Sequence, residues 1–173
     1  KIRIHLKQLN HKDIQNNQQQ FPITIVCDAI RTPGNIGMCF RIAESFGVSK
    51  IYLHQSSPST ENNTVKRTAR NTINQIEHTI YSNFNDTIRK LKEEGNTIIG
   101  IEITDKSIDI QDFNFKNLKK IVLLLGSERN GIKNIEYLDH SICIPMFGRN
   151  SSMNVIHSLG IALYEATNQL KKK

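Results

Sequence analysis

Short apolar runs alternate with segments of helical periodicity from residue 21 to about residue 170, and this alternation constrains the fold most. The runs are rich in β-branched residues, which is typical of buried strands. Strands are expected at 23–30, 51–53, 76–81, 97–103, 119–125 and 141–145. Helices are expected at 36–46, at 84–94 with Asn83 or Asn85 as the candidate cap, in a short segment ending near 138, and at 153–170. This order favours an α/β domain with a mainly parallel sheet flanked by helices.

The first twenty residues are polar and rich in Asn and Gln. They read as a solvated leader, in which residues 4–13 could form a short helix. At about 150 residues per domain, the remaining segment 21–173 is expected to form one domain. Residues 105–118 are expected to be mostly loop.

Charge and residue counts limit the classes of partner. The chain has 23 Lys and Arg residues against 16 Asp and Glu residues, a formal net charge of +7. That surplus suggests a polyanionic partner, with nucleic acid as the first candidate. The longest apolar run, 121–125, is far too short to span a bilayer, so no membrane partner is expected.

Cysteine and histidine spacing gives no sign of a metal site. Cys27, Cys39 and Cys143 are far apart and form no C-x-x-C pair, and the six histidines show no H-x-x-x-H spacing. We therefore expect no metal, and we expect buried, reduced thiols in a cytoplasmic protein.

Three junctions that follow expected strands are polar, and ligands of parallel α/β folds bind at such junctions. In the first, Gly34 and Gly37 leave room at the start of a helix for a backbone or an anion, and Asn35 can cap that helix. Arg41 follows six residues after Asn35 in an otherwise apolar stretch. It could equally be an exposed arginine on an amphipathic helix. The glycine spacing is not the G-x-G-x-x-G fingerprint of dinucleotide binding.

The second and third junctions each allow a functional and a purely structural reading. Glu128 follows a buried strand and a glycine, where its carboxylate could accept hydrogen bonds from a ribose or an arginine. Alternatively, Glu128 could have only a structural role, because a negative charge in the first turn of a helix interacts favourably with the helix dipole. In the third junction, Ser152 or Asn154 would cap the last helix. A long polar loop at such a place also often carries function. His157 reads as a surface or packing residue.

Together the three junctions resemble the motifs of the SpoU (TrmH-type) branch of the SPOUT RNA ribose 2′-O-methyltransferases. The resemblance runs from 21 to about 170. It is carried by Asn35-x-Gly37-x-x-x-Arg41-x-Ala43, by Leu125-Gly126-Ser127-Glu128-x-x-Gly131, and by Ile144-Pro145-Met146 with Ser152-Met153-Asn154-Val155 and Tyr164-Glu165-Ala166. Three positions depart from the family pattern. Met153 replaces the usual Leu, Ile156 the usual Ser and Ser158 the usual Ala, and Ile156 removes a hydroxyl near the start of the last helix.

The resemblance implies an α/β fold with a C-terminal trefoil knot and a homodimer. It also implies S-adenosylmethionine-dependent methylation of a ribose 2′-hydroxyl in tRNA or rRNA. The implied catalytic residues are Arg41, Asn35, Glu128, Ser152 and Asn154. The implied cofactor-binding residues are Gly126, Ser127, Ile144, Met146, Met153 and Asn154. The expected RNA-binding residues are Lys66, Arg67, Arg70 and Arg149.

Two questions stay open at the level of sequence. Arg41 is the family's proposed general base, yet arginine is almost never deprotonated in proteins, so it could instead bind the RNA phosphate and orient the hydroxyl. The alternative to an enzyme is a non-catalytic RNA-binding protein that keeps the SPOUT fold.

Overall fold

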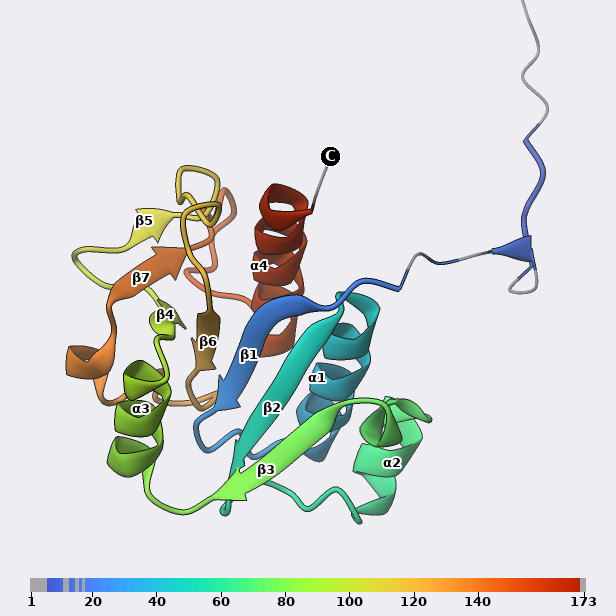
Figure 1. Ribbon diagram of the computed structural model, residues 1–173, viewed down its shortest axis with the longest axis horizontal. Helices are drawn as coiled ribbons and strands as arrows, with labels where there is room; N and C mark the ends of the chain where they lie inside the picture. Colours follow the sequence, from blue (N-terminus) through green and yellow to red (C-terminus); the bar gives the residue numbers. More distant parts are fainter. Residues whose placement is uncertain (1–5, 11–12, 15, 17, 172–173) are drawn as a thin grey trace, which may run out of the picture.

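The computed structural model describes residues 6–10, 13, 14, 16 and 18–171. A parallel sheet of seven strands runs through the centre in the order β3-β2-β1-β6-β4-β7-β5 (Figure 1). The strands are β1 (Phe21–Cys27), β2 (Val48–His54), β3 (Glu77–Tyr81), β4 (Thr97–Ile101), β5 (Ile108–Asp109), β6 (Ile121–Leu125) and β7 (His140–Cys143). The α/β class with a parallel sheet, expected from the sequence, is confirmed.

Both faces of the sheet are buried, and alternate residues of its central strands face opposite sides. In β6 all five residues are buried; Leu123 and Leu125 belong to the cluster that includes α1 and α4, whereas Val122 and Leu124 belong to the cluster that includes α3. Since side chains alternate along a strand, a strand covered on both faces reads as a continuous apolar run. This explains why β6 is the clearest strand in the sequence.

Helices flank the sheet on both faces. The α-helices are α1 (Pro33–Ser45), α2 (Asn63–Ala69), α3 (Phe84–Glu93) and α4 (Val155–Leu170), and the 3-10 helices are η2 (Thr72–Asn74) and η3 (Ile135–Tyr137). Helix α1 packs against both α2 and α4. Among the described residues, no helix is both long and apolar enough to cross a membrane.

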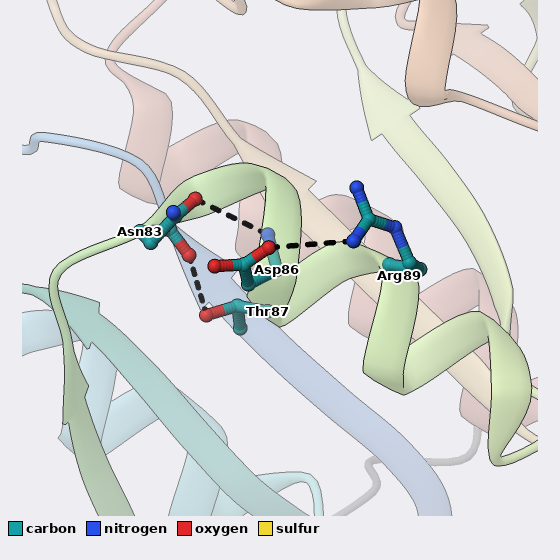
Figure 2. Close-up of polar contacts among 4 residues, drawn as sticks. All are labelled: Asn83, Asp86, Thr87 and Arg89. Atoms are coloured by element: carbon teal, nitrogen blue, oxygen red, sulfur yellow. Dashed lines mark hydrogen bonds and ion pairs between the residues drawn. The ribbon is translucent and has the colours of Figure 1, made fainter.

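Helix α3 begins with an N-cap of the kind expected from the sequence (Figure 2). The side-chain oxygen of Asn83 accepts a hydrogen bond from the backbone N–H of Asp86 at 3.2 Å, and the Thr87 hydroxyl donates to the Asn83 carbonyl at 2.8 Å. Asp86 lies in the first turn, where the helix dipole favours a negative charge, and the Arg89 guanidinium lies 3.5 Å from its carboxylate. All of these contacts join residues within one or two turns of the chain.

Several expected boundaries are wrong by a few residues. The first strand ends at Cys27 instead of residue 30, because Ala29 takes a left-handed backbone with φ of 60°. The fourth strand ends at Ile101 instead of residue 103, and the last helix starts at Val155 instead of residue 153. The short helix near 138 is the 3-10 helix η3.

Three other local expectations also differ from the structure. Helix α2 was not expected, although Asn62 caps it by accepting from the backbone N–H groups of Thr64 and Val65. The two-residue strand β5 lies within the segment expected to be loop. Residues 6–10 form neither helix nor strand, and the other residues of the expected 4–13 helix, apart from Asp13, lie outside the described residues.

Because all strands are parallel, their carboxyl ends meet at one edge of the sheet. The segments after β1, β4, β6 and β7 therefore come together there, although they are far apart in the sequence.

Candidate active site

A chain of hydrogen bonds joins the three junctions. The Glu128 carboxylate, after β6, accepts hydrogen bonds from the backbone N–H groups of Arg31 and Thr32, each at 3.0 Å, and from the side-chain amide of Asn35 at 2.9 Å. The Asn35 side-chain oxygen in turn accepts from the Asn154 amide at 3.2 Å. One polar residue from each junction thus takes part in a single connected network.

The network also organises two helix N-termini. Thr32, at the N-cap of α1, makes no side-chain cap hydrogen bond, and its own N–H donates to the Glu128 carboxylate just before the helix begins. Asn154 caps α4 by accepting from the backbone N–H of Ile156 at 2.8 Å. Of the two residues expected to cap the last helix, Asn154 rather than Ser152 does so.

These hydrogen bonds determine the charge state of Glu128. Partial burial by itself would raise the pKa of the Glu128 carboxyl, but the backbone N–H groups of Arg31 and Thr32 and the Asn35 side chain outweigh it and lower the pKa from 4.5 to about 2. Glu128 is therefore ionised at neutral pH. A carboxylate with so low a pKa is a weak base, so its geometry suits positioning rather than proton transfer.

A cavity of about 330 Å³ lies beside this network, and we call it the strand-end cavity. Its walls come from the segments after β4, β6 and β7. They are formed by Ile101, Glu102, Ile103, Gly126, Ser127, Glu128, Arg129, Gly131, Ile142, Cys143, Ile144, Met146, Ser151, Ser152, Met153, Asn154, Val155 and Ser158. All six residues expected to bind the cofactor are among them, and so are three of the five expected catalytic residues: Glu128, Ser152 and Asn154.

Glycines shape the wall formed by the loop after β6. A Cβ atom added at Gly126 would lie 2.0 Å from the carbonyl carbon of Gly131, and Gly131 itself has a left-handed backbone with φ of 60°. Both positions therefore require glycine. The loop is therefore tight, and its residues Gly126, Ser127 and Gly131 line the cavity with little side-chain volume.

Two expected catalytic residues lie outside the cavity wall. Asn35 is joined to it through Glu128 and Asn154. Arg41, further along α1, is half-buried, and its guanidinium forms no hydrogen bond or ion pair with any residue that the structure describes. Its charge is thus free to meet an external group.

None of the four expected RNA-binding residues lines the cavity. Lys66 and Arg67 are exposed on α2, and Arg70 follows it with a left-handed φ of 57°. Lys66 forms an ion pair with Glu61 at 2.6 Å, so its charge is partly compensated. Arg149 is exposed in the loop between β7 and α4.

Two charged residues of the cavity, Glu102 and Arg129, are missing from the site residues predicted from the sequence. The sequence predicts a strand over 97–103, which places Glu102 inside the sheet, whereas β4 ends at Ile101. The available signal was a carboxylate directly after a buried parallel strand, the same signal that drew attention to Glu128. The thiols of Cys27 and Cys39 are buried and free, as expected, whereas Cys143 is half-buried in the cavity wall.

The structure is that of a parallel α/β domain with a ligand-sized cavity at the carboxyl ends of its strands, joined to a polar network across three junctions. Residues 22–164 match the SpoU rRNA Methylase family, which is most of the chain. The chain belongs to that family.

Individual relatives agree with this assignment. The chain is 30% identical over 171 residues to the 23S rRNA (guanosine-2'-O-)-methyltransferase RlmB of Neisseria meningitidis, covering 98% of this chain and 65% of that protein. It is 33% identical over 166 residues to an uncharacterized tRNA/rRNA methyltransferase of Borreliella burgdorferi, covering 92% of this chain and 72% of that protein. The chain thus spans about two thirds of the length of these relatives.

Solved structures show the same fold. The AdoMet-bound rRNA methyltransferase of Sinorhizobium meliloti superposes with a TM-score of 0.81 at 27% identity, over 90% of this chain and 59% of that one. The A. aeolicus TrmH/SpoU tRNA modifying enzyme superposes with a TM-score of 0.78 at 23% identity, over 88% of this chain and 77% of that one.

Proposed function

We propose that this chain is an S-adenosylmethionine-dependent methyltransferase that acts on a ribose 2′-hydroxyl of tRNA or rRNA. The observation that carries the proposal is the hydrogen-bonded chain Glu128–Asn35–Asn154 beside the strand-end cavity. It unites the three family motifs at one place. The names of the relatives make a guanosine of 23S rRNA the first substrate to test.

The strand-end cavity fits the cofactor in size and chemistry. Its volume of about 330 Å³ is within the usual range for small-molecule sites. Ile144, Met146 and Met153 offer apolar contacts for an adenine ring, and the glycine-shaped loop at Gly126 offers backbone groups for hydrogen bonds. When bound, S-adenosylmethionine supplies an electrophilic methyl group on a sulfonium, which needs little activation.

The acceptor side is assigned to Arg41 and the polar network. Arg41 binds an RNA phosphate through its planar guanidinium and thereby orients the ribose hydroxyl for attack. The hydroxyl proton passes to that phosphate or to water as the oxygen takes up the methyl group. Glu128 fixes the start of α1 and the Asn35 side chain, and Asn154 links them to the start of α4. Ser152, exposed in the cavity wall, is placed to contact the incoming ribose.

RNA binding is assigned to the exposed cations outside the cavity. Arg67 and Arg70 extend the positive surface at α2, and Arg149 does so in the loop before α4. The net charge of +7 supports binding to a phosphate backbone. An RNA-modifying role in turn favours a cytoplasmic location.

We further propose that residues 21–173 form the methyltransferase domain, that its C-terminal part is threaded as a trefoil knot, and that it works as a homodimer. The knot is supported by the place of β4 between β6 and β7 and by the contact of α4 with α1. The dimer is supported by exposed apolar side chains one turn apart on α4: Ile161 is 39% exposed and Tyr164 is 63% exposed. Light scattering on the wild-type protein and on Tyr164→Lys tests this, since a dimer built on α4 should dissociate in the variant.

The proposed function is tested by calorimetry and by methyl transfer. The wild-type chain should bind S-adenosylmethionine and transfer its labelled methyl group to 23S rRNA. Arg41→Lys should still bind the cofactor but lose most of its turnover, because lysine lacks the planar fork. Retention of substantial turnover would instead indicate that Arg41 contributes only a positive charge.

The alternative is a non-catalytic RNA-binding protein. Absence of S-adenosylmethionine binding at millimolar concentration would contradict the enzyme proposal. Ribose-methylation mapping of total RNA from a deletion strain gives the independent check. Loss of a single 2′-O-methyl group would identify the substrate, whereas an unchanged map would favour the non-catalytic alternative.

A further inference from the structure

Glu102 is a cavity residue outside all three family motifs. It directly follows β4, lines the strand-end cavity and is half-buried. Among the described residues, no Lys, Arg or His forms an ion pair with its carboxylate. A carboxylate in such a position needs hydrogen-bond donors to offset the loss of water.

Backbone groups hold both oxygens of this carboxylate in place. Oε1 accepts from the N–H of Ile103 at 2.9 Å, and Oε2 accepts from the N–H of Ile132 at 2.8 Å. A carboxylate has about four acceptor positions, so each oxygen can accept at least one more hydrogen bond. The orientation of the acceptor pair is thus set before any ligand arrives.

The loop after β6 is shaped to fit against this side chain. A Cβ atom added at Gly131 would overlap Oε2 of Glu102, so a larger residue there would require the carboxylate to move. The contact brings the carboxylate against Gly131, which is itself a wall of the cavity.

The sheet order places Glu102 at the middle of the cavity. Strand β4 lies between β6 and β7. The segment after β6 leads to the polar side, with Glu128 and the link to Asn35, and the segment after β7 leads to the apolar side, with Ile144 and Met146. A cofactor with its reacting end at the polar side and its adenine ring at the apolar side would have its ribose between them, next to the end of β4.

We propose that Glu102 binds the ribose of S-adenosylmethionine by accepting hydrogen bonds from its 2′- and 3′-hydroxyls. The inference rests on the proposed function, because it concerns the cofactor of that same site. Two neighbouring hydroxyls match two preoriented carboxylate oxygens, and an ionised acceptor strengthens each hydrogen bond. Glu102 thus selects a ribonucleoside over a deoxyribonucleoside in the cavity.

The test compares two ligands on four proteins by calorimetry. The ligands are S-adenosylhomocysteine and its 2′-deoxyribose analogue. The proteins are the wild type, Glu102→Ala, Glu102→Gln and the control Glu136→Ala, which removes an exposed carboxylate on η3 outside the cavity. A hydrogen bond to a charged acceptor is worth roughly 10- to 100-fold in affinity. The wild type and the control should therefore prefer the ribose form by that factor, and Glu102→Ala should lose the preference.

Glu102→Gln keeps one oxygen acceptor, so its preference for S-adenosylhomocysteine over the 2′-deoxyribose analogue should be reduced. This variant replaces Glu102→Ala in the test if the alanine variant does not fold. Equal weakening of both ligands, with the preference retained, would show that Glu102 only anchors the loop and would overturn the inference. A third ligand, the des-amino analogue of S-adenosylhomocysteine, tests contact with the amino group. If Glu102→Ala no longer prefers S-adenosylhomocysteine over this analogue, Glu102 binds the methionine end of the cofactor, and the inference is overturned. If the wild type binds neither ligand, the proposed function fails first and the inference with it.

Discussion

The N-termini of α1 and α3 are held by different kinds of hydrogen bond. Helix α3 is capped by Asn83, the residue directly before it, with Asp86 as the donor (Figure 2). At α1 the N-cap residue Thr32 makes no side-chain cap; its own N–H donates to Glu128, 96 residues further along the chain, and we call this contact the remote cap. A local cap stabilises one helix, whereas a remote cap makes the position of α1 depend on the loop after β6.

The start of α4 combines the two solutions. Asn154 caps its own helix through the N–H of Ile156 and also donates to Asn35, 119 residues away. The two remote connections converge on Asn35 and so tie α1 to both other junctions. Among the helices that the structure describes, these remote contacts lie where we assign the chemistry, and the local cap at Asn83 lies on a helix that contributes nothing to the cavity.

Replacing Glu128 should have the largest effect of the changes considered, because it removes the remote cap. In Glu128→Ala, the N–H groups of Arg31 and Thr32 and the Asn35 amide lose their acceptor. A small displacement of reacting groups can reduce a rate about 100-fold, so methyl transfer should fall by that order. Stability should fall by only about 1–2 kcal/mol, because Glu128 is exposed and water can replace its contacts.

The measurements are single-turnover methyl transfer and urea unfolding on the same preparations. The control is Glu136→Ala, which should match the wild type in both. Wild-type turnover in Glu128→Ala would contradict the idea that the remote cap serves the reaction.

The remote cap should also depend on pH, whereas the cap of α3 should not, since an amide does not titrate. The folded-state pKa of Glu128, about 2, lies below its ordinary value of 4.5. The stabilisation is therefore complete above about pH 4.5 and is lost as the pH falls toward 2. The difference in unfolding free energy between the wild type and Glu128→Gln, about 1 kcal/mol at neutral pH after solvent screening, should shrink over that interval.

Urea unfolding at several pH values between 7 and 3 measures this difference. The same series on Asn83→Ala provides the comparison and should show a constant difference from the wild type. A constant difference for Glu128→Gln as well would mean that the charge of the carboxylate is not what stabilises the start of α1.

The link between Asn35 and Asn154 can be isolated by a double-mutant cycle. Asn35→Ala and Asn154→Ala each remove one partner, and the double variant removes both. The two changes should be non-additive in stability by about 0.5–1 kcal/mol, the usual coupling between residues in direct contact. Strictly additive effects would indicate that the two junctions do not support each other.

The contrast between local and remote contacts also explains which parts of the fold and of the site can be predicted from the sequence. The strands and the cap at Asn83 are visible because their causes lie within a few residues: apolar runs such as 121–125, and an Asn before an amphipathic segment. The family motifs predict Asn35, Glu128 and Asn154 as residues of one site. Their hydrogen bonds could not be predicted, because they depend on which strand ends become neighbours in the sheet. Glu102 was missed for the same reason, as its partners Ile132 and Gly131 come from another strand junction.

The smallest expected effect is that of the local cap. Asn83→Ala removes the acceptor for the Asp86 N–H and should reduce the unfolding free energy by about 0.5–1 kcal/mol, the usual contribution of an exposed N-cap. Asn83→Ser should restore most of the loss, because serine is also a good cap. Methyl transfer should stay at the wild-type level in both variants, since α3 lies on the face of the sheet opposite α1 and α4 and contributes no residue to the cavity. If turnover in Asn83→Ala falls by more than its loss of stability explains, the cap of α3 also affects the reaction. That result would contradict the distinction between a cap that only stabilises its helix and a contact that positions catalytic residues.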